Sequence, residues 1–207
     1  IQEIIKNEEG VFLLDRLKSI LESNVTNEMA YTVGAIMADG YFRVNERQGD
    51  IMFTQKIPEK MKFIEHLSYC FQETFSHKLV EKMTKSNGGI INGRKVLGCA
   101  TDFIGHSQMA AYQMKEIYEN TDSWVLSLNQ TASANFLAGL IDGDGTWNKK
   151  RKILQIFNGD ERIVGAAMLV CLKLGALPYI SKQRKNCYII QIPDIENHLF
   201  HYTKRVK

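Results

Sequence analysis

The stretch that decides the fold is Leu137-Ala138-Gly139-Leu140-Ile141-Asp142-Gly143-Asp144-Gly145. Its run of apolar residues is typical of a buried helix, and Gly145 marks the end of that helix. Gly139 and Gly143 are four residues apart, so one stripe of the helix is nearly bare of side chains. Because bare stripes let two helix backbones approach closely, the stretch predicts a tightly packed helix pair with Asp144 at its end.

A weaker copy of this stretch lies 105 residues earlier, at Thr32-Val33-Gly34-Ala35-Ile36-Met37-Ala38-Asp39-Gly40. Gly34 and Ala38 repeat the bare stripe, and Asp39 repeats the acid at its end. If the two helices pack along their stripes, Asp39 and Asp144 arrive side by side. Two neighbouring carboxylates repel each other, and a divalent cation relieves that repulsion. Although an Asp-Gly at a helix end is commonly only a capping turn, two copies predict a Mg²⁺ site that acts on phosphate.

The same order of elements follows each copy of the stretch. In the first part of the chain we expect, by periodicity and turn residues, a helix from Thr26 or Asn27 to Gly40, strands at 41–46 and 51–56, a helix at 58–75, strands at 77–85 and 94–103, and a helix at 107–118. In the second part we expect a helix from Thr131 or Ser133 to Gly145, strands at 147–152 and 153–157, a helix at 161–174, strands at 178–182 and 187–192, and a helix at 195–202.

This duplication predicts an α+β fold of two pseudo-symmetric αββαββα halves, with antiparallel sheets and with the motif helices packed at the interface. The predicted organisation is an N-terminal helical extension at 1–25, a first half at 26–125 and a second half at 126–207.

The composition excludes several classes of protein. With 207 residues and 44% apolar residues, the chain is neither disordered nor fibrous, and it contains no apolar run long enough to span a membrane. The four cysteines are widely separated and form neither a zinc motif nor a disulfide framework, so we expect an intracellular, reducing compartment.

The net charge of +3 hides an uneven distribution of charge. The regions 41–56, 77–103, 145–158 and 178–192 contain 15 Lys and Arg residues against four acids, whereas the rest of the chain contains 11 basic and 19 acidic residues. Charge runs are commonly solvated faces, but four basic strand regions together favour a nucleic-acid partner. The DNA-binding candidates are Arg43, Arg47, Thr54, Lys82, Lys85, Arg94, Lys149, Lys150, Arg151, Lys152, Gln155, Lys182, Arg184 and Lys185.

The motif carries a family resemblance. Residues 137–145 differ from the nonapeptide LAGLIDADG only at Gly143, which stands in place of alanine. The first copy is weaker and agrees at Gly34, Ile36, Ala38, Asp39 and Gly40. From about residue 26 to its end, the chain resembles a monomeric, double-motif LAGLIDADG homing endonuclease.

The resemblance implies saddle-shaped sheets over a long duplex site and Mg²⁺-dependent hydrolysis of one phosphodiester in each strand, leaving 3′ overhangs. It implies that Mn²⁺ substitutes for Mg²⁺, that Ca²⁺ supports binding without cleavage, and that the gene lies in an intron or an intein. It assigns the metal to Asp39, Asp144 and the carbonyls of Ala38 and Gly143. Asp142 matches a different motif position, so we assign it to packing or capping.

The resemblance also implies a polar residue on the second strand of each half and a basic residue near the active centre. Gln55 and Asn158 match the polar residue, although strand ends are commonly polar without a role in catalysis. The catalytic lysine candidates are Lys204 and Lys207, which follow the last expected helix, and Lys56, although a solvated side chain is the simpler explanation for each of them.

Two other functions remain open on the same fold: an RNA-binding maturase that assists a group I intron, and a DNA-binding protein that does not cleave.

Overall fold

The structure is a computed structural model that describes residues 25–57, 59–84, 89–91, 94–96, 100–184, 187–193 and 202–204. The expected N-terminal extension and the expected helix at 195–202 lie outside the described residues, apart from Val25 and Tyr202. None of the described helices is long and apolar enough to cross a membrane.

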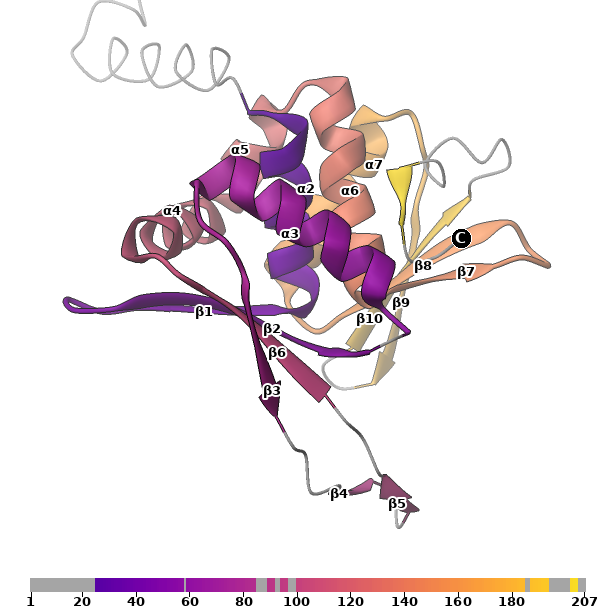
Figure 1. Cartoon of the computed structure of the whole chain (residues 1–207). Helices are drawn as coiled ribbons and strands as arrows, with labels where there is room; N and C mark the ends of the chain where they lie inside the picture. The colour runs from indigo at the N-terminus through magenta and orange to yellow at the C-terminus, as the bar shows by residue number, and fades with distance from the viewer. Residues whose placement is uncertain are drawn as a thin grey trace, which may run out of the picture.

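Two buried helices run through the centre of the molecule, side by side (Figure 1). They are α2, Asn27–Asp39, and α6, Gln130–Asp144. The Thr26 hydroxyl caps α2 by accepting a hydrogen bond from the N–H of Met29. The side chain of Asn129 caps α6 in the same way, so α6 begins slightly before the expected start at Thr131 or Ser133.

The bare stripes are the contact between these helices, as expected from the sequence. A Cβ added to Gly34 would lie 2.1 Å from the carbonyl oxygen of Phe136, and one added to Gly139 would lie 2.2 Å from that of Tyr31. A Cβ on Gly143 would lie 2.4 Å from the Ala38 methyl group. The two backbones therefore approach more closely than any side chain at these glycines would permit.

Each motif helix leads directly into the first strand of an antiparallel sheet. The strand order is β1-β2-β6-β3 in the first half and β7-β8-β10-β9 in the second half. The register is also repeated, because Gly40 pairs with Phe53 just as Gly145 pairs with Ile156. The fold is thus the expected α+β arrangement of two related halves.

The elements of the first half, after α2, are β1 Gly40–Val44, β2 Gly49–Lys56, α3 Met61–Phe75, β3 Val80–Thr84, β4 Gly89–Ile91, β5 Arg94–Val96, β6 Ala100–His106 and α4 Gln108–Glu119. The elements of the second half, after α6, are β7 Gly145–Asn148, β8 Ile153–Asn158, α7 Glu161–Lys173, β9 Tyr179–Arg184 and β10 Cys187–Pro193. The sheets lie below the helices in Figure 1, and the hairpins β1–β2 and β7–β8 extend to opposite sides.

Side chains alternate across the sheets between the helices and an open face. In β2, Ile51 and Phe53 are buried beneath the helices, whereas Thr54 and Lys56 are exposed on the other side. In β8, Leu154 and Ile156 are buried in the same way. The helices cover one face of each sheet, and the other face is open.

Two strand predictions were wrong. The strand expected at 147–152 ends at Asn148, because the N–H of Arg151 donates to the Asn148 side chain and carbonyl and closes a turn over 149–152. The region expected as one strand at 94–103 contains β5, which pairs with β4, and the start of β6, which pairs with β2 and β3, with residues 97–99 between them outside the described residues.

A helix that the sequence analysis missed, α5 Thr121–Ser127, connects the two halves. It crosses the boundary predicted between residues 125 and 126. Lys173, at the end of α7, donates from Nζ to the carbonyls of Val125, Leu126 and Leu128, with a distance of 2.8 Å to Leu126. Burial lowers the pKa of Lys173. The ammonium thus satisfies carbonyls at the C-terminal end of α5 and ties the connection to the second half.

We expect Lys173→Met to lower the free energy of unfolding by about 1 kcal/mol, because three helix-end carbonyls, two of them partly buried, would lose their donor. Chemical denaturation of the full chain would measure the change. Lys115→Met is the matched control, since Lys115 is exposed and makes only a helical ion pair with Glu119 at 3.9 Å. Equal losses in the two variants would contradict this role of Lys173.

Candidate active site

Asp39 is the last residue of α2, and its carboxylate is held by two side chains of the first half. Its Oδ2 accepts hydrogen bonds from Gln55 Nε2 at 2.7 Å and from Lys60 Nζ at 2.8 Å. Gln55 comes from the helix-facing side of β2, and Lys60 immediately precedes α3. The end of the motif helix thus becomes a partly buried site with a carboxylate, an amide and an ammonium.

Gln55 is almost fully buried, at 1% exposure. Its Nε2 is used by Asp39, and its Oε1 has no hydrogen-bond partner among the described residues. A buried amide oxygen without a donor is costly, so a cation or a bound water would stabilise it.

Asn158 is the counterpart of Gln55 in the second half. Each lies two residues after the residue that pairs with the glycine ending the motif helix, Phe53 or Ile156. The hairpin of the second half is two residues shorter, which explains the different sequence spacing. The Asn158 side chain, however, accepts the N–H of Asp160 at 2.8 Å and shapes the start of α7.

The two motif ends meet at Gly143. A Cβ on Gly143 would lie 3.4 Å from both the Cβ and the backbone N of Asp39, so the residue before Asp144 abuts the first acid. Asp144 is half-buried. No group of three or more His, Cys, Asp or Glu side chains able to hold a metal occurs in the part of the chain that the structure describes. The protein donors would therefore be the two aspartates and neighbouring backbone or amide oxygens.

Asp142 is fully buried and takes part in packing. Its Oδ2 accepts from the Tyr31 hydroxyl at 2.8 Å and from the backbone N–H of Lys204 at 2.6 Å. The carboxylate therefore links α2 to residues 202–204, in agreement with the expected structural role.

The lysine candidates have different partners in the structure. Lys56 is exposed and pairs with Glu59 at 2.8 Å. Lys204 acts electrostatically on His66 and Cys70 of α3. The pKa of His66 is lowered mainly by burial and, to a smaller extent, by the charge of Lys204. Lys60, which the sequence analysis missed, is the lysine that contacts Asp39. No signal in the sequence separates Lys60 from Lys56, because Lys60 reaches Asp39 only when the start of α3 lies beside the end of α2.

The residue at the N-cap of the second helix differs between the two halves. Lys60 occupies the N-cap position of α3, and the N-cap position of α7 is Asp160, which accepts from the Tyr118 hydroxyl and the backbone N–H of Arg162. These two equivalent positions therefore carry side chains of opposite charge.

We expect Lys60→Met to strengthen Mn²⁺ binding by the full chain without DNA about threefold to tenfold, because an ammonium beside Asp39, the expected metal ligand, would repel the cation. Calorimetric titration would measure the affinity. Lys56→Met, which removes an exposed lysine of the same region, should leave it unchanged. Weaker Mn²⁺ binding by Lys60→Met would contradict this expectation.

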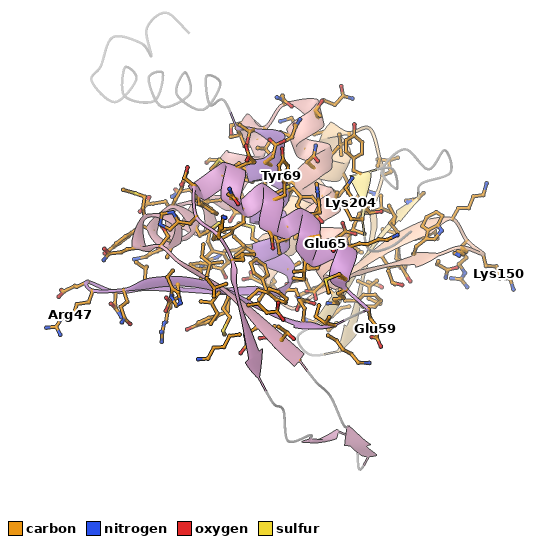
Figure 2. All side chains as sticks on the ribbon, viewed as in Figure 1. Arg47, Glu59, Glu65, Tyr69, Lys150 and Lys204 are labelled. Carbon is orange, nitrogen blue, oxygen red and sulfur yellow. The ribbon has the colours of Figure 1, made fainter. Side chains whose placement is uncertain are left out.

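The DNA-binding candidates of the first sheet divide by location. Arg43, Thr54 and Lys82 lie on strands, and Arg47 lies in the β1–β2 turn at the end of the hairpin (Figure 2). Arg43 pairs with Asp50 at 2.7 Å, and Thr54 donates to Asp102 at 2.7 Å. Lys85 is outside the described residues, and only the backbone of Arg94 is described.

In the second sheet, Gln155 lies between Thr146 and Gln191 on neighbouring strands. The basic candidates at 149–152 form the turn at the end of the β7–β8 hairpin, where Lys150 lies (Figure 2). Lys182 lies over the Tyr188 ring, and Tyr188 donates to Glu161 of α7, so this lysine is engaged beside a helix. Lys185 is outside the described residues, and only the backbone of Arg184 is described.

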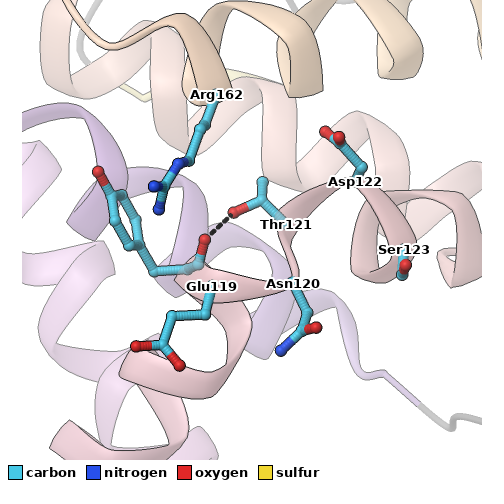
Figure 3. A pocket seen from close by; sticks show the side chains of 7 residues that line it. Glu119, Asn120, Thr121, Asp122, Ser123 and Arg162 are labelled. Atoms are coloured by element: carbon cyan, nitrogen blue, oxygen red, sulfur yellow. Dashed lines mark hydrogen bonds between the residues drawn. The ribbon is translucent and has the colours of Figure 1, made fainter.

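A separate pocket of about 270 Å³ lies where α4 meets α5 (Figure 3). Arg162 packs over the Tyr118 ring beside it, and Thr121 donates to the Tyr118 carbonyl at 2.7 Å. The pocket contains none of the candidate site residues.

The described cysteines are free, and burial raises the pKa of Cys70 and of Cys171 to about 12, which makes both thiols unreactive at neutral pH.

Comparison with known proteins supports the family resemblance. The family model described as a LAGLIDADG-like domain matches residues 131–199. A curated relative, "Probable phosphoenolpyruvate synthase" of Methanocaldococcus jannaschii, is 26% identical over 99% of this chain. The chain spans only 16% of the length of that relative.

Several solved structures have the same fold. The homing endonuclease I-DmoI in complex with DNA and Mn is 19% identical, with a TM-score of 0.61, over 89% of this chain and 99% of that one. I-DmoI with DNA and Ca gives a TM-score of 0.59 at 19% identity, over 84% and 86% of the two chains. The N-terminal LAGLIDADG domain of DUF199/WhiA gives 0.53 at 15% identity, over 91% of this chain and 86% of that one.

A LAGLIDADG-like domain model thus matches residues 131–199, and with its duplicated motif helices and two equivalent sheets this chain has the fold of the solved structures of the homing endonuclease I-DmoI.

Proposed function

We propose that this protein is a sequence-specific DNA endonuclease that cuts both strands of a long duplex site with a divalent metal ion. The observation that carries the proposal is the meeting of the two motif ends, where Gly143 abuts Asp39 and an acid is the last residue of each helix. The open faces of two sheets lie on either side of this point, which suits a duplex with its scissile phosphates at the centre.

The residues at this point fit a divalent metal ion. Asp39 and Asp144 offer hard carboxylate oxygens, which Mg²⁺ prefers, and the buried Gln55 Oε1 lacks a donor among the described residues. We infer that Asp39, Asp144 and the carbonyls of Ala38 and Gly143 would hold the metal, with phosphate and water completing its coordination. Bound there, the metal would polarise the phosphate and lower the pKa of an attacking water.

The other side chains prepare the site for this chemistry. Gln55 fixes the orientation of the Asp39 carboxylate through its Nε2 hydrogen bond. Lys60 balances the charge of Asp39 and brings a positive group close to the position of a scissile phosphate. The tight contact between α2 and α6 holds the two acids on rigid elements, which limits the reorganisation needed during hydrolysis.

Related structures support the same activity. I-DmoI is described as a homing endonuclease and has been solved with its DNA and with Mn, Mg or Ca. By this similarity we propose Mg²⁺ as the working ion, Mn²⁺ as a substitute and Ca²⁺ as an ion that supports binding alone. We also propose that the protein acts as a monomer, because both acids come from one chain.

The curated relative favours one origin for this domain, because the chain matches only 16% of the length of that longer protein. A LAGLIDADG segment within a protein named for synthase activity suggests an endonuclease domain carried inside a longer coding sequence. We therefore favour an intein over a free-standing intron reading frame, and we assign no synthase activity to this chain.

The direct test is selection of cleaved sites from a pool of randomised duplexes with Mg²⁺. We expect one long sequence to be enriched among double-strand breaks, and EDTA to prevent its enrichment. If the protein enriches a duplex by binding but never cuts it, the non-cleaving alternative would replace the proposal. Selective binding of intron RNA, unchanged by loss of both aspartates, would instead favour a maturase.

A further inference from the structure

A row of three side chains crosses the open face of the first sheet. Arg43 on β1 is the registered partner of Asp50 on β2, and Asp50 is the registered partner of His106 on β6. Arg43 Nε and Nη2 donate to Asp50 Oδ2 at 2.9 and 2.7 Å, and His106 Nδ1 lies 2.7 Å from Asp50 Oδ1. Because an ionised carboxylate only accepts hydrogen bonds, His106 donates from Nδ1. The carboxylate is thereby held from both sides.

This row fixes which edge of the Arg43 guanidinium is available to a ligand. Asp50 accepts hydrogen bonds from Nε and from one hydrogen of Nη2, which together form the side edge of the planar guanidinium group. The end edge, made of Nη1 and the remaining hydrogen of Nη2, makes no hydrogen bond with the described residues. Two parallel N–H groups at that spacing match the O6 and N7 acceptors of guanine in the major groove. Arg43 is 57% exposed and borders a surface hollow of about 360 Å³.

A phosphate is a less suitable partner for Arg43. The Asp50 carboxylate, 2.7 Å from the guanidinium, would repel an anion but not the neutral acceptors of a base edge. The hydrogen bonds from His106 and then Arg43 lower the pKa of Asp50, so this carboxylate is charged at neutral pH. Arg47, in the turn of the same hairpin, has no ion pair with the described part of the chain and is suited to phosphate.

We infer that Arg43 reads one guanine in the half-site of the first sheet, with Asp50 and His106 as positioning residues that present its end edge to the base. The inference rests on the proposed function, because it requires the open face of the sheet to enter the major groove. It assigns a base identity to one position of the target, whereas composition assigned only a general affinity for DNA.

The test measures base preference rather than cleavage. Duplexes enriched from a randomised pool by the full chain in Ca²⁺ would be sequenced, and affinities for all four bases at each position would then be titrated. We expect one position in the first half-site to prefer guanine by about tenfold or more. Arg43→Ala should reduce this preference to about twofold or less, and Asp50→Ala should weaken it while other positions keep theirs.

Arg47→Ala is the matched control, since it removes an arginine from the same hairpin. It should weaken binding to all sequences alike and leave the guanine preference intact. Thermal denaturation of each variant would verify that the sheet is folded. An enriched sequence whose preferences are the same in Arg43→Ala would overturn the inference and leave the endonuclease proposal standing. If no duplex is enriched at all, the proposed function fails and this inference fails with it.

Discussion

Asp39→Asn and Asp144→Asn are each expected to reduce double-strand cleavage by about 10³-fold or more, because under the proposed function each would remove a charged oxygen ligand from the metal ion. Binding to the enriched duplex in Ca²⁺ should change little, since the open faces of the sheets are untouched. Single-turnover cleavage in Mg²⁺ and a binding titration in Ca²⁺ would measure the two effects separately. Full cleavage by the double variant would refute the assignment of the acids.

Asp142→Asn is the matched control, because it changes the same residue type only two positions from Asp144 on the same helix. Asp142 is buried and accepts hydrogen bonds from Tyr31 and from the backbone of Lys204. We expect this variant to lower the free energy of unfolding by about 1–3 kcal/mol and to retain metal-dependent cleavage at a temperature where it is folded. Loss of cleavage with unchanged stability would place Asp142 in the chemistry instead.

Gly34→Ala and Gly139→Ala are expected to have the largest effects on stability, each about 3 kcal/mol or more. At both positions the added methyl group would overlap a backbone carbonyl of the facing helix, at 2.1 and 2.2 Å. A backbone atom cannot rotate away, so the helices would have to separate and the two motif ends with them. Thermal and chemical denaturation would measure the loss, and cleavage should fall even where the protein remains folded.

Gly165→Ala is the control for these variants. Gly165 lies inside α7, and a Cβ there would have no atom within 4 Å. Alanine should therefore stabilise the helix by about 0.5–1 kcal/mol. If all three alanines shifted stability equally, helix propensity rather than close packing would explain the motif glycines.

The departure from the LAGLIDADG motif at Gly143 has a physical explanation in the same interface. A methyl group on Gly143 would lie 2.4 Å from the Ala38 methyl group of the first copy. Only one of the two facing positions can therefore carry a methyl group. In this chain it belongs to Ala38, the third residue from the end of the weaker motif.

Local patterns predicted the elements that depend on neighbouring residues. The capping role of Thr26, the ends of the motif helices at Gly40 and Gly145 and the bare stripes follow from interactions within four residues. The prediction of a strand at 147–152 is wrong because the Asn148 side chain accepts the N–H of Arg151 and closes a turn there. Helix α5 was missed because its polar start resembles a loop.

The sequence by itself determined the duplicated fold, the pairing of the motif helices and the two acids at their ends, because helix periodicity and small-residue spacing are local properties. Only the tertiary structure decided that Lys60 rather than Lys56 contacts Asp39, and that Asp50 links Arg43 to His106. These partners come from different strands and helices, so strand register and the approach of α3 bring them together. No spacing along the chain encodes such contacts directly, because they form only when the sheets and helices pack.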